Sequence, residues 1–459
     1  MIWLILILAL FLRLINLSQS LWLDEAINVV FARSSSFWWF ITKYPIGDFH
    51  PPGWFVLLWI WGHFFGFSEM AVRLPSVILG IASVGLTFLL GKELFSKKVG
   101  LLAAFLLSIA PLHIYYSQEA RMYVLAVFST TLSFYFLNRL ILQKKYSSIG
   151  FVLSLVLVLS SDYLAYFVIL AQIFYLIWTR KMCKDILINF LISIILFSPW
   201  FFIFPVQLEK GINTASVLPG WANVVGSSIK DLTLIPIKTI FGRVTFLDKT
   251  FYIVAVSLAG VLYGSVFLRG LKKMDNATKL LLSWIFIPLI FSFLISFFIP
   301  ILAYFRMIFI LPAFYLILSK SLLNLPKKIV GLAAILICIV SIASLLGYYI
   351  NPKFQREDWR GAVNFVSSQL NNQTLVIFEN NEVPSPVVYY RNDLSNFKPG
   401  ILDNLEGELK GKNKVFVFEY LVDVYDPKKI VERKLKSLSF IQIKTYDFSG
   451  VGFVKLYTK

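Results

Sequence analysis

The chain has 459 residues, of which 58% are hydrophobic, 17% aromatic and only 15% charged, whereas a soluble domain is about 45–50% apolar and about 25% charged. Its apolar residues fall in runs of roughly 17–22, the length that crosses a bilayer. These figures exclude an ordinary soluble protein and predict a mainly α, polytopic membrane protein. The net charge of +18 is then a topology signal and does not indicate a nucleic-acid partner.

The first apolar run, 1–17, is predicted to be a retained helix. It lacks a basic leading segment, carries Arg13 within the run, and no small-residue cleavage site follows it. Cys183 and Cys338 lie in separate segments, so no disulfide or metal framework is expected.

About eleven spans are predicted from hydropathy, and the stretch 52–67 is ambiguous. If 52–67 lies along the membrane surface, the Lys/Arg-rich segments at 91–98, 138–145, 179–185, 269–279 and 325–328 all fall on one side, which is then cytoplasmic. The Pro-Pro pair and three tryptophans of "HPPGWFVLLWIW" suit an interfacial helix. We therefore expect a multi-pass protein of the cell membrane with a cytoplasmic N-terminus and an extracytoplasmic C-terminus. The spans are expected at 1–17, 72–91, 99–116, 121–138, 147–162, 163–179, 185–204, 251–268, 280–299, 302–319 and 329–349.

This topology gives a transmembrane domain, 1–350, with a first outer loop at 18–71 and a second large outer loop at 206–250. Charge rises after residue 350, and helical patterns alternate with short apolar runs. Residues 351–459 are thus predicted to form a small extracytoplasmic α/β domain. Its expected helices are 356–370 and 426–438, and its expected strands are 374–378, 414–420, 440–446 and 451–457.

Most of the conspicuous polar residues collect on the outer face under this topology, although ionisable groups at membrane depth are costly and are usually paired or functional. They predict a polar cavity ringed by aromatic residues. The residues are Asp24, Glu25, His50, Arg73, Gln118, Glu119, Arg121, Asp162, Tyr163, Tyr304 and Arg306.

Transfer of a sugar from a lipid phosphate to a hydroxyl needs these residue types. The phosphate leaves without a strong acid, the hydroxyl needs a carboxylate base, and Arg stabilises the departing phosphate. The three histidines have no zinc-site spacing. No resident cofactor or metal is predicted, and a carboxylate-bound divalent cation is left open.

The segments "LWLDEA", "HPPGW", "EMAVRLPSVILG", "YSQEARMY" and "YFRMIFILP" resemble those of the GT-C membrane glycosyltransferases. They are similar in particular to the protein O-mannosyltransferase-like superfamily, that is, glycosyltransferase family 39 and its bacterial relatives that act on lipid A and surface polysaccharides. The resemblance covers roughly residues 1–320. It implies a membrane enzyme that uses a polyprenyl-phosphate sugar on the outer face.

The resemblance also implies roles for single residues. Asp24 would be the catalytic base, with Glu25 beside it, and Arg306 a phosphate ligand. One departure is Asp162 in "SSDYLAYF", where relatives often have His, which puts acceptor recognition in question. The other residues implied to bind substrate or line the site are His50, Gln118, Glu119, Arg121, Tyr123 and Tyr304.

Alternatives remain open at this point. Asp24 and Glu25 could cap a helix, and Arg306 could reach lipid headgroups. A lipid-linked sugar flippase or secondary transporter is a second class, although no internal repeat is visible. A scaffold that binds a partner through its tail is a third. The main hypothesis is an inverting glycosyltransferase of the hexosyl or pentosyl class, with an unspecified sugar and a lipid, glycan or protein acceptor.

Overall fold

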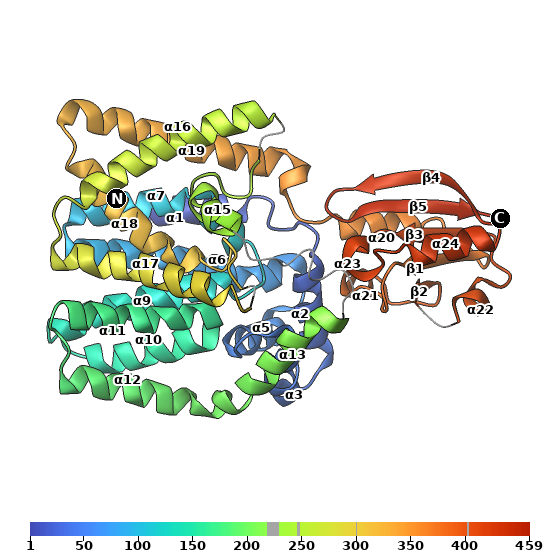
Figure 1. The fold of residues 1–459 in the computed structure, drawn as a ribbon, viewed down its shortest axis with the longest axis horizontal. Helices are drawn as coiled ribbons and strands as arrows, with labels where there is room; N and C mark the ends of the chain where they lie inside the picture. Colours follow the sequence, from blue (N-terminus) through green and yellow to red (C-terminus); the bar gives the residue numbers. More distant parts are fainter. Residues whose placement is uncertain (218–228, 246–247, 300, 402–403) are drawn as a thin grey trace.

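The computed structural model describes residues 1–217, 229–245, 248–299, 301–401 and 404–459. A bundle of helices occupies most of the chain, and a small α/β domain projects from one end of it (Figure 1). The predicted fold class, a helical membrane domain followed by a small α/β domain, is confirmed.

The bundle contains long apolar helices and shorter ones that pack across their ends. The 3₁₀ turns among them are η1 (Tyr163–Tyr166), η2 (Ser198–Phe202) and η3 (Ile308–Ile310). The α-helices are α1 (Ile2–Leu14), α2 (Leu23–Ser34), α3 (Phe37–Thr42), α4 (Pro45–Asp48), α5 (Gly53–Phe65), α6 (Glu69–Leu94), α7 (Lys97–Ser108), α8 (Pro111–Ser117), α9 (Tyr123–Ile141), α10 (Ser147–Ser161), α11 (Phe167–Trp178), α12 (Lys184–Phe197), α13 (Phe204–Val217), α15 (Ile229–Phe241), α16 (Lys249–Gly270), α17 (Asn276–Ile295), α18 (Leu311–Leu323) and α19 (Lys327–Ile350).

Within the described residues, six helices are long and apolar enough to cross a membrane, or seven if the bent pair α7–α8 is one span. Shorter apolar helices coincide with four more predicted spans, at α1, α10, α11 with η1, and α18 with η3. The chain is thus a multi-span membrane protein, and the total of about eleven spans stays a prediction. Helix α5 has 13 residues, as many as α1, and its place along the membrane surface stays a prediction.

A bend of 63° separates α7 from α8, where Pro111 cannot continue the backbone hydrogen bonding. The buried Arg13 side chain lies at this break and donates from Nη1 to the carbonyl of Ser108 at 3.2 Å. Its Nη2 contacts His113 Nδ1 at 2.6 Å. Backbone groups freed inside a bilayer must find such partners, so Arg13 stabilises the bend that leads into residues 117–121.

The α/β domain has one five-stranded sheet in the order β2-β1-β3-β5-β4. β2, β1 and β3 run parallel, and β3 pairs antiparallel with β5, as β5 does with β4. β1 is wholly buried, as expected of a central parallel strand. The elements are α20 (Trp359–Ser367), β1 (Thr374–Phe378), α21 (Ser385–Tyr390), β2 (Phe397–Pro399), α22 (Leu405–Leu409), β3 (Lys414–Phe418), α23 (Val422–Tyr425), α24 (Ile430–Ser437), β4 (Ile441–Phe448) and β5 (Gly452–Thr458).

Several details differ from the sequence prediction. The helices α21, α22 and α23 were not predicted, and the helix expected from residue 426 begins at Ile430. The helix expected from residue 356 begins at Trp359, because Asp358 caps it by accepting from the Gly361 N–H at 3.0 Å. The strand β2 was not predicted, since it has three residues and ends in Pro399.

The α/β domain packs against the first outer loop, where α21 contacts α2 (Figure 1). The Leu21 N–H donates to the Tyr390 hydroxyl at 2.9 Å, and the Tyr389 hydroxyl donates to the Phe67 carbonyl at 2.9 Å. The C-terminal domain therefore contacts the loop that carries Asp24 and Glu25.

Candidate active site

The two neighbouring carboxylates at the start of α2 have different surroundings. Glu25 is fully buried and forms a paired contact with Arg73, at 2.9 Å to Nε and 2.5 Å to Nη2. It also accepts from the Ala120 N–H at 2.7 Å. Burial alone would raise the pKa of Glu25, but Arg73 outweighs it and the pKa is lowered. Glu25 thus joins α2, α6 and the loop after α8.

Asp24 keeps a partly free carboxylate. Its side chain is 35% exposed, and its nearest ion-pair contact is Arg121 Nη2 at 3.5 Å. Desolvation raises the pKa of Asp24 although Arg121 opposes it. A carboxylate with a raised pKa and an open face suits a general base.

Asp48 was not predicted from the sequence, yet it connects the predicted residues. One oxygen of Asp48 lies 2.5 Å from His50 Nδ1, and the other lies 3.1 Å from Arg121 Nη1 and 3.3 Å from the Tyr44 hydroxyl. Burial would raise the pKa of Asp48, but Arg121 and His50 lower it. Arg121 therefore lies between Asp24 and Asp48. The one signal in the sequence was the position of Asp48 two residues before the His-Pro-Pro segment.

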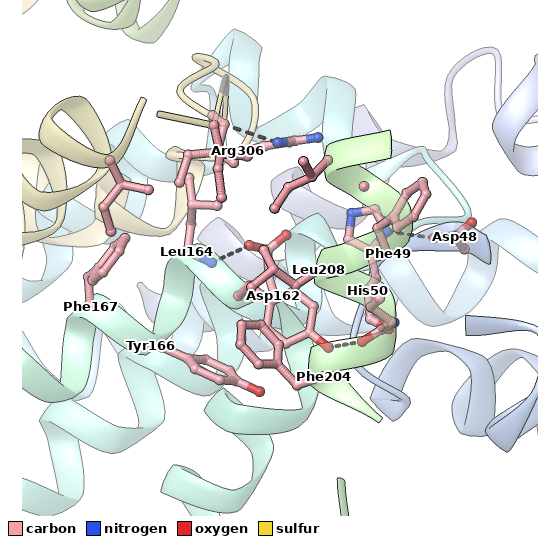
Figure 2. Close-up of a pocket in the computed structure, with 17 residues that line it drawn as sticks. Asp48, Phe49, His50, Asp162, Leu164, Tyr166, Phe167, Phe204, Leu208 and Arg306 are labelled. Atoms are coloured by element: carbon pink, nitrogen blue, oxygen red, sulfur yellow. Dashed lines mark hydrogen bonds and ion pairs between the residues drawn. The ribbon is translucent and has the colours of Figure 1, made fainter. Parts of the chain in front are cut away.

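A cavity of about 390 Å³ opens beside this network. Its walls are mainly apolar and aromatic and come from η1, the start of α11, α13 and the end of α17 (Figure 2). Its lining residues with polar groups are Asp48, His50, Asp162, Tyr163, Tyr166, Gln207 and Arg306.

Asp162 and Arg306 face the same cavity from different elements (Figure 2). Asp162 accepts from the Leu164 N–H at 2.8 Å and so caps η1. Arg306 donates from Nη1 to the Ile301 carbonyl at 3.2 Å. No described residue forms an ion pair with Arg306, so its charge is available to an anion in the cavity.

Three other predicted residues form the wall behind the network and are absent from the lining of this cavity. Gln118 Nε2 donates to the Ile15 carbonyl at 2.6 Å, and Glu119 pairs with Arg356 of the C-terminal segment. Tyr123 packs edge-on against Phe305, with ring centroids 5.5 Å apart.

A basic and aromatic cluster from the second outer loop lies near Tyr304. Arg243 Nη1 donates to the Tyr115 hydroxyl at 2.7 Å, and Lys238 Nζ lies 5.9 Å from the Tyr304 ring centroid. Lys238 is 7% exposed, and burial together with Arg243 lowers its pKa to about 8. Neither cation has an ion pair among the residues the structure covers. Lys238 was missed because its local sequence is that of an ordinary amphipathic helix.

In the part of the chain that the structure describes, no group of three or more His, Cys, Asp and Glu side chains is placed to hold a metal ion. Two carboxylates of the network, Asp24 and Asp48, share the guanidinium of Arg121.

Residues 49–203 match the family described as dolichyl-phosphate-mannose-protein mannosyltransferase. No curated protein sequence matches the chain.

Solved structures share the whole architecture at low sequence identity. ArnT from Cupriavidus metallidurans, solved with undecaprenyl phosphate, is 10% identical, with a TM-score of 0.58 over 99% of this chain and 97% of that one. The Archaeoglobus fulgidus oligosaccharyltransferase is 12% identical, with a TM-score of 0.51 over 91% and 69% of the two chains.

The mycobacterial arabinofuranosyltransferase AftD is 11% identical, with a TM-score of 0.50 over 100% of this chain and 41% of that one. This chain thus spans about two fifths of AftD. The resemblance found in the sequence is confirmed: the chain has the GT-C fold of membrane glycosyltransferases and is similar to the protein O-mannosyltransferase-like superfamily.

Proposed function

We propose that this protein is an inverting glycosyltransferase, which moves a sugar from a polyprenyl-phosphate donor to an acceptor hydroxyl on the extracytoplasmic side. One observation carries the proposal. The partly exposed carboxylate of Asp24 is held beside the Arg121–Asp48–His50 network, next to a largely apolar cavity with an unpaired Arg306. The structure of ArnT with undecaprenyl phosphate supports the choice of donor class.

Asp24 takes the proton of the acceptor hydroxyl as the hydroxyl oxygen bonds to the anomeric carbon. The bond between that carbon and the phosphate oxygen breaks, and its electron pair leaves with the polyprenyl phosphate. Attack opposite the leaving group inverts the anomeric configuration. A product with retained configuration would refute this mechanism.

Cations without carboxylate partners stabilise the charge that grows on the leaving phosphate. Arg306, from the turn before η3, and Lys238 and Arg243, from the second outer loop, supply three such charges. The apolar wall of the cavity, with Phe204 and Ile295, suits the isoprenoid chain.

The remaining predicted residues act around these groups. His50 and Asp48 orient Arg121, and Asp162 lines the cavity, where sugar hydroxyls would meet it. Tyr304 lies outside this lining, next to Lys238. Glu25, Gln118, Glu119 and Tyr123 hold the walls in place.

The proposed side of the membrane is supported by where the basic loops meet. Arg139 pairs with Glu93 at 3.1 Å, Lys320 with Asp275 at 2.9 Å, and Lys279 lies 5.0 Å from the Trp178 ring centroid. These contacts join four Lys/Arg-rich loops at one end of the bundle, opposite the C-terminal domain (Figure 1). By the positive-inside rule that end is cytoplasmic.

The test uses purified protein with a panel of polyprenyl-phosphate sugars and host membrane extract, and measures release of free polyprenyl phosphate. Wild type is compared with Asp24→Asn and with the control Asp185→Asn, an acidic residue in the first turn of α12. We expect release by wild type and by the control, and loss in Asp24→Asn. Equal release by all three would remove Asp24 from the base role. Uptake of lipid-linked sugar by vesicles without any release would instead indicate a flippase.

A further inference from the structure

The segment 356–360 connects the helical bundle to the α/β domain and contacts the outer loops with successive residues. Arg356 pairs with Glu119, and its backbone N–H donates to Gln19 Oε1 at 2.9 Å. Arg360 Nη1 lies 3.1 Å from Glu69 Oε1. The segment is therefore fixed against the loop that carries Asp24.

Glu357, between these two arginines, contacts both domains. Its Oε2 accepts from Trp359 Nε1 at 2.7 Å, and the Tyr420 hydroxyl donates to the carboxylate at 3.1 Å. The Trp359 ring is fully buried in the α/β core. The same Oε2 accepts from the backbone N–H of Leu23 at 3.2 Å. Glu357 thus links the core of the C-terminal domain to the residue that precedes Asp24.

Leu23 is the first residue of α2, and the first N–H groups of a helix have no partner within the helix. A carboxylate at that position supplies one and also interacts favourably with the helix dipole. Within α2, Glu25 accepts from the neighbouring Trp22 N–H at 3.5 Å, and Glu357 is the side chain that accepts from the Leu23 N–H. Glu357 therefore helps to fix the orientation of the turn on which Asp24 stands.

We propose that Glu357 is a positioning residue for Asp24, so that the C-terminal domain forms part of the catalytic centre. The proposal rests on the proposed function of Asp24. It predicts that the state of the Glu357 carboxylate affects turnover and leaves donor binding unchanged.

Asp24 of α2 and Tyr420 after β3 are the titratable groups that face Glu357. Burial raises the pKa of Glu357 to about 7 although three hydrogen bonds oppose it. The ionised form binds the Leu23 N–H more firmly. Turnover should thus rise as the pH passes through about 7.

The experiment measures kcat and donor KM from about pH 6 to about pH 8.5 for wild type, Glu357→Gln and Tyr420→Phe. We expect Glu357→Gln to lose the step near pH 7 and to lower kcat by about tenfold or more, since small displacements near a reaction cost up to about 100-fold. Donor KM should not change. Tyr420→Phe removes a donor that favours the ionised form, so the step should move to higher pH.

Glu379→Gln is the matched control. Burial also raises the pKa of Glu379, to about 8, and no described side-chain hydrogen bond joins it to the first outer loop. It should keep the wild-type profile. If the role of Glu357 were purely structural, Glu357→Gln would yield less active protein, and the rise of kcat near pH 7 would stay in place.

A Glu357→Gln enzyme with wild-type kcat and an unchanged step would overturn the proposal. If Glu357→Gln does not fold, Tyr420→Phe provides the test. A shift of the kcat step to higher pH supports the proposal, and an unchanged step overturns it. Asp24→Asn is run in the same assay. If that variant is inactive while Glu357→Gln is normal, this inference fails and the proposed function stands; if Asp24→Asn is fully active, both fail.

Discussion

The adjacent carboxylates of α2 allow a sharp prediction, because the structure gives them different surroundings. Glu25→Gln keeps the shape of the side chain and removes the charge that pairs with Arg73. Both side chains are at most 1% exposed, and breaking such a buried pair costs about 3–5 kcal/mol. Arg73 also donates to the carbonyls of Leu17, Gln19 and Ser20 at 2.6–3.0 Å. These contacts partly compensate its charge, so we expect the lower limit, about 3 kcal/mol.

The assay is thermal unfolding in detergent, followed by loss of the folded peak. If the 459 residues unfold as one unit with about 2.1 cal/mol/K per residue, 3 kcal/mol lowers the midpoint by about 3 °C. Asp24→Asn removes a 35% exposed carboxylate and should change the midpoint by less than about 1 °C, while transfer is lost. An unchanged midpoint in Glu25→Gln, or a destabilised Asp24→Asn that still turns over, would refute this assignment.

Three further outcomes are expected. Donor affinity should fall as the pH rises through about 8, where Lys238 loses its proton; donor KM against pH should show this in wild type and stay flat in Lys238→Arg. Asp48→Asn should lower kcat by about 10- to 100-fold with the fold intact, because Arg121 and His50 lose their shared partner; single-turnover rates and the unfolding midpoint would separate the two effects. Burial raises the pKa of Glu379 to about 8 in the folded state. The free energy of unfolding should therefore decrease as the pH rises from about 4.5 to about 8. Glu379→Gln should weaken that dependence, Glu357 contributing the remainder, and an equal fall of the unfolding midpoint with pH in both proteins would contradict it.

The sequence by itself determined the membrane class, the helical bundle and the α/β tail. These follow from local quantities, namely the length of apolar runs, the placement of Lys and Arg, and the alternation of short strands with helices. It also predicted that the Asp24 region and Arg306 share one polar site, because ionisable residues avoid the bilayer centre. The short strand β2 escaped this reasoning because three residues ending in Pro399 carry no periodic signal.

Only the tertiary structure decided which of Asp24 and Glu25 is buried in an ion pair and which stays partly exposed. Asp24 and Glu25 differ by about 100° around one helix, and the partner that buries Glu25 is Arg73, 48 residues away. Glu357 carries no local pattern that marks it, and Asp48 is marked only by its place two residues before His50. Their other partners, Leu23 and Arg121, come from distant segments. The pairing and burial of charges depend on how remote elements pack together, and local sequence does not encode that packing.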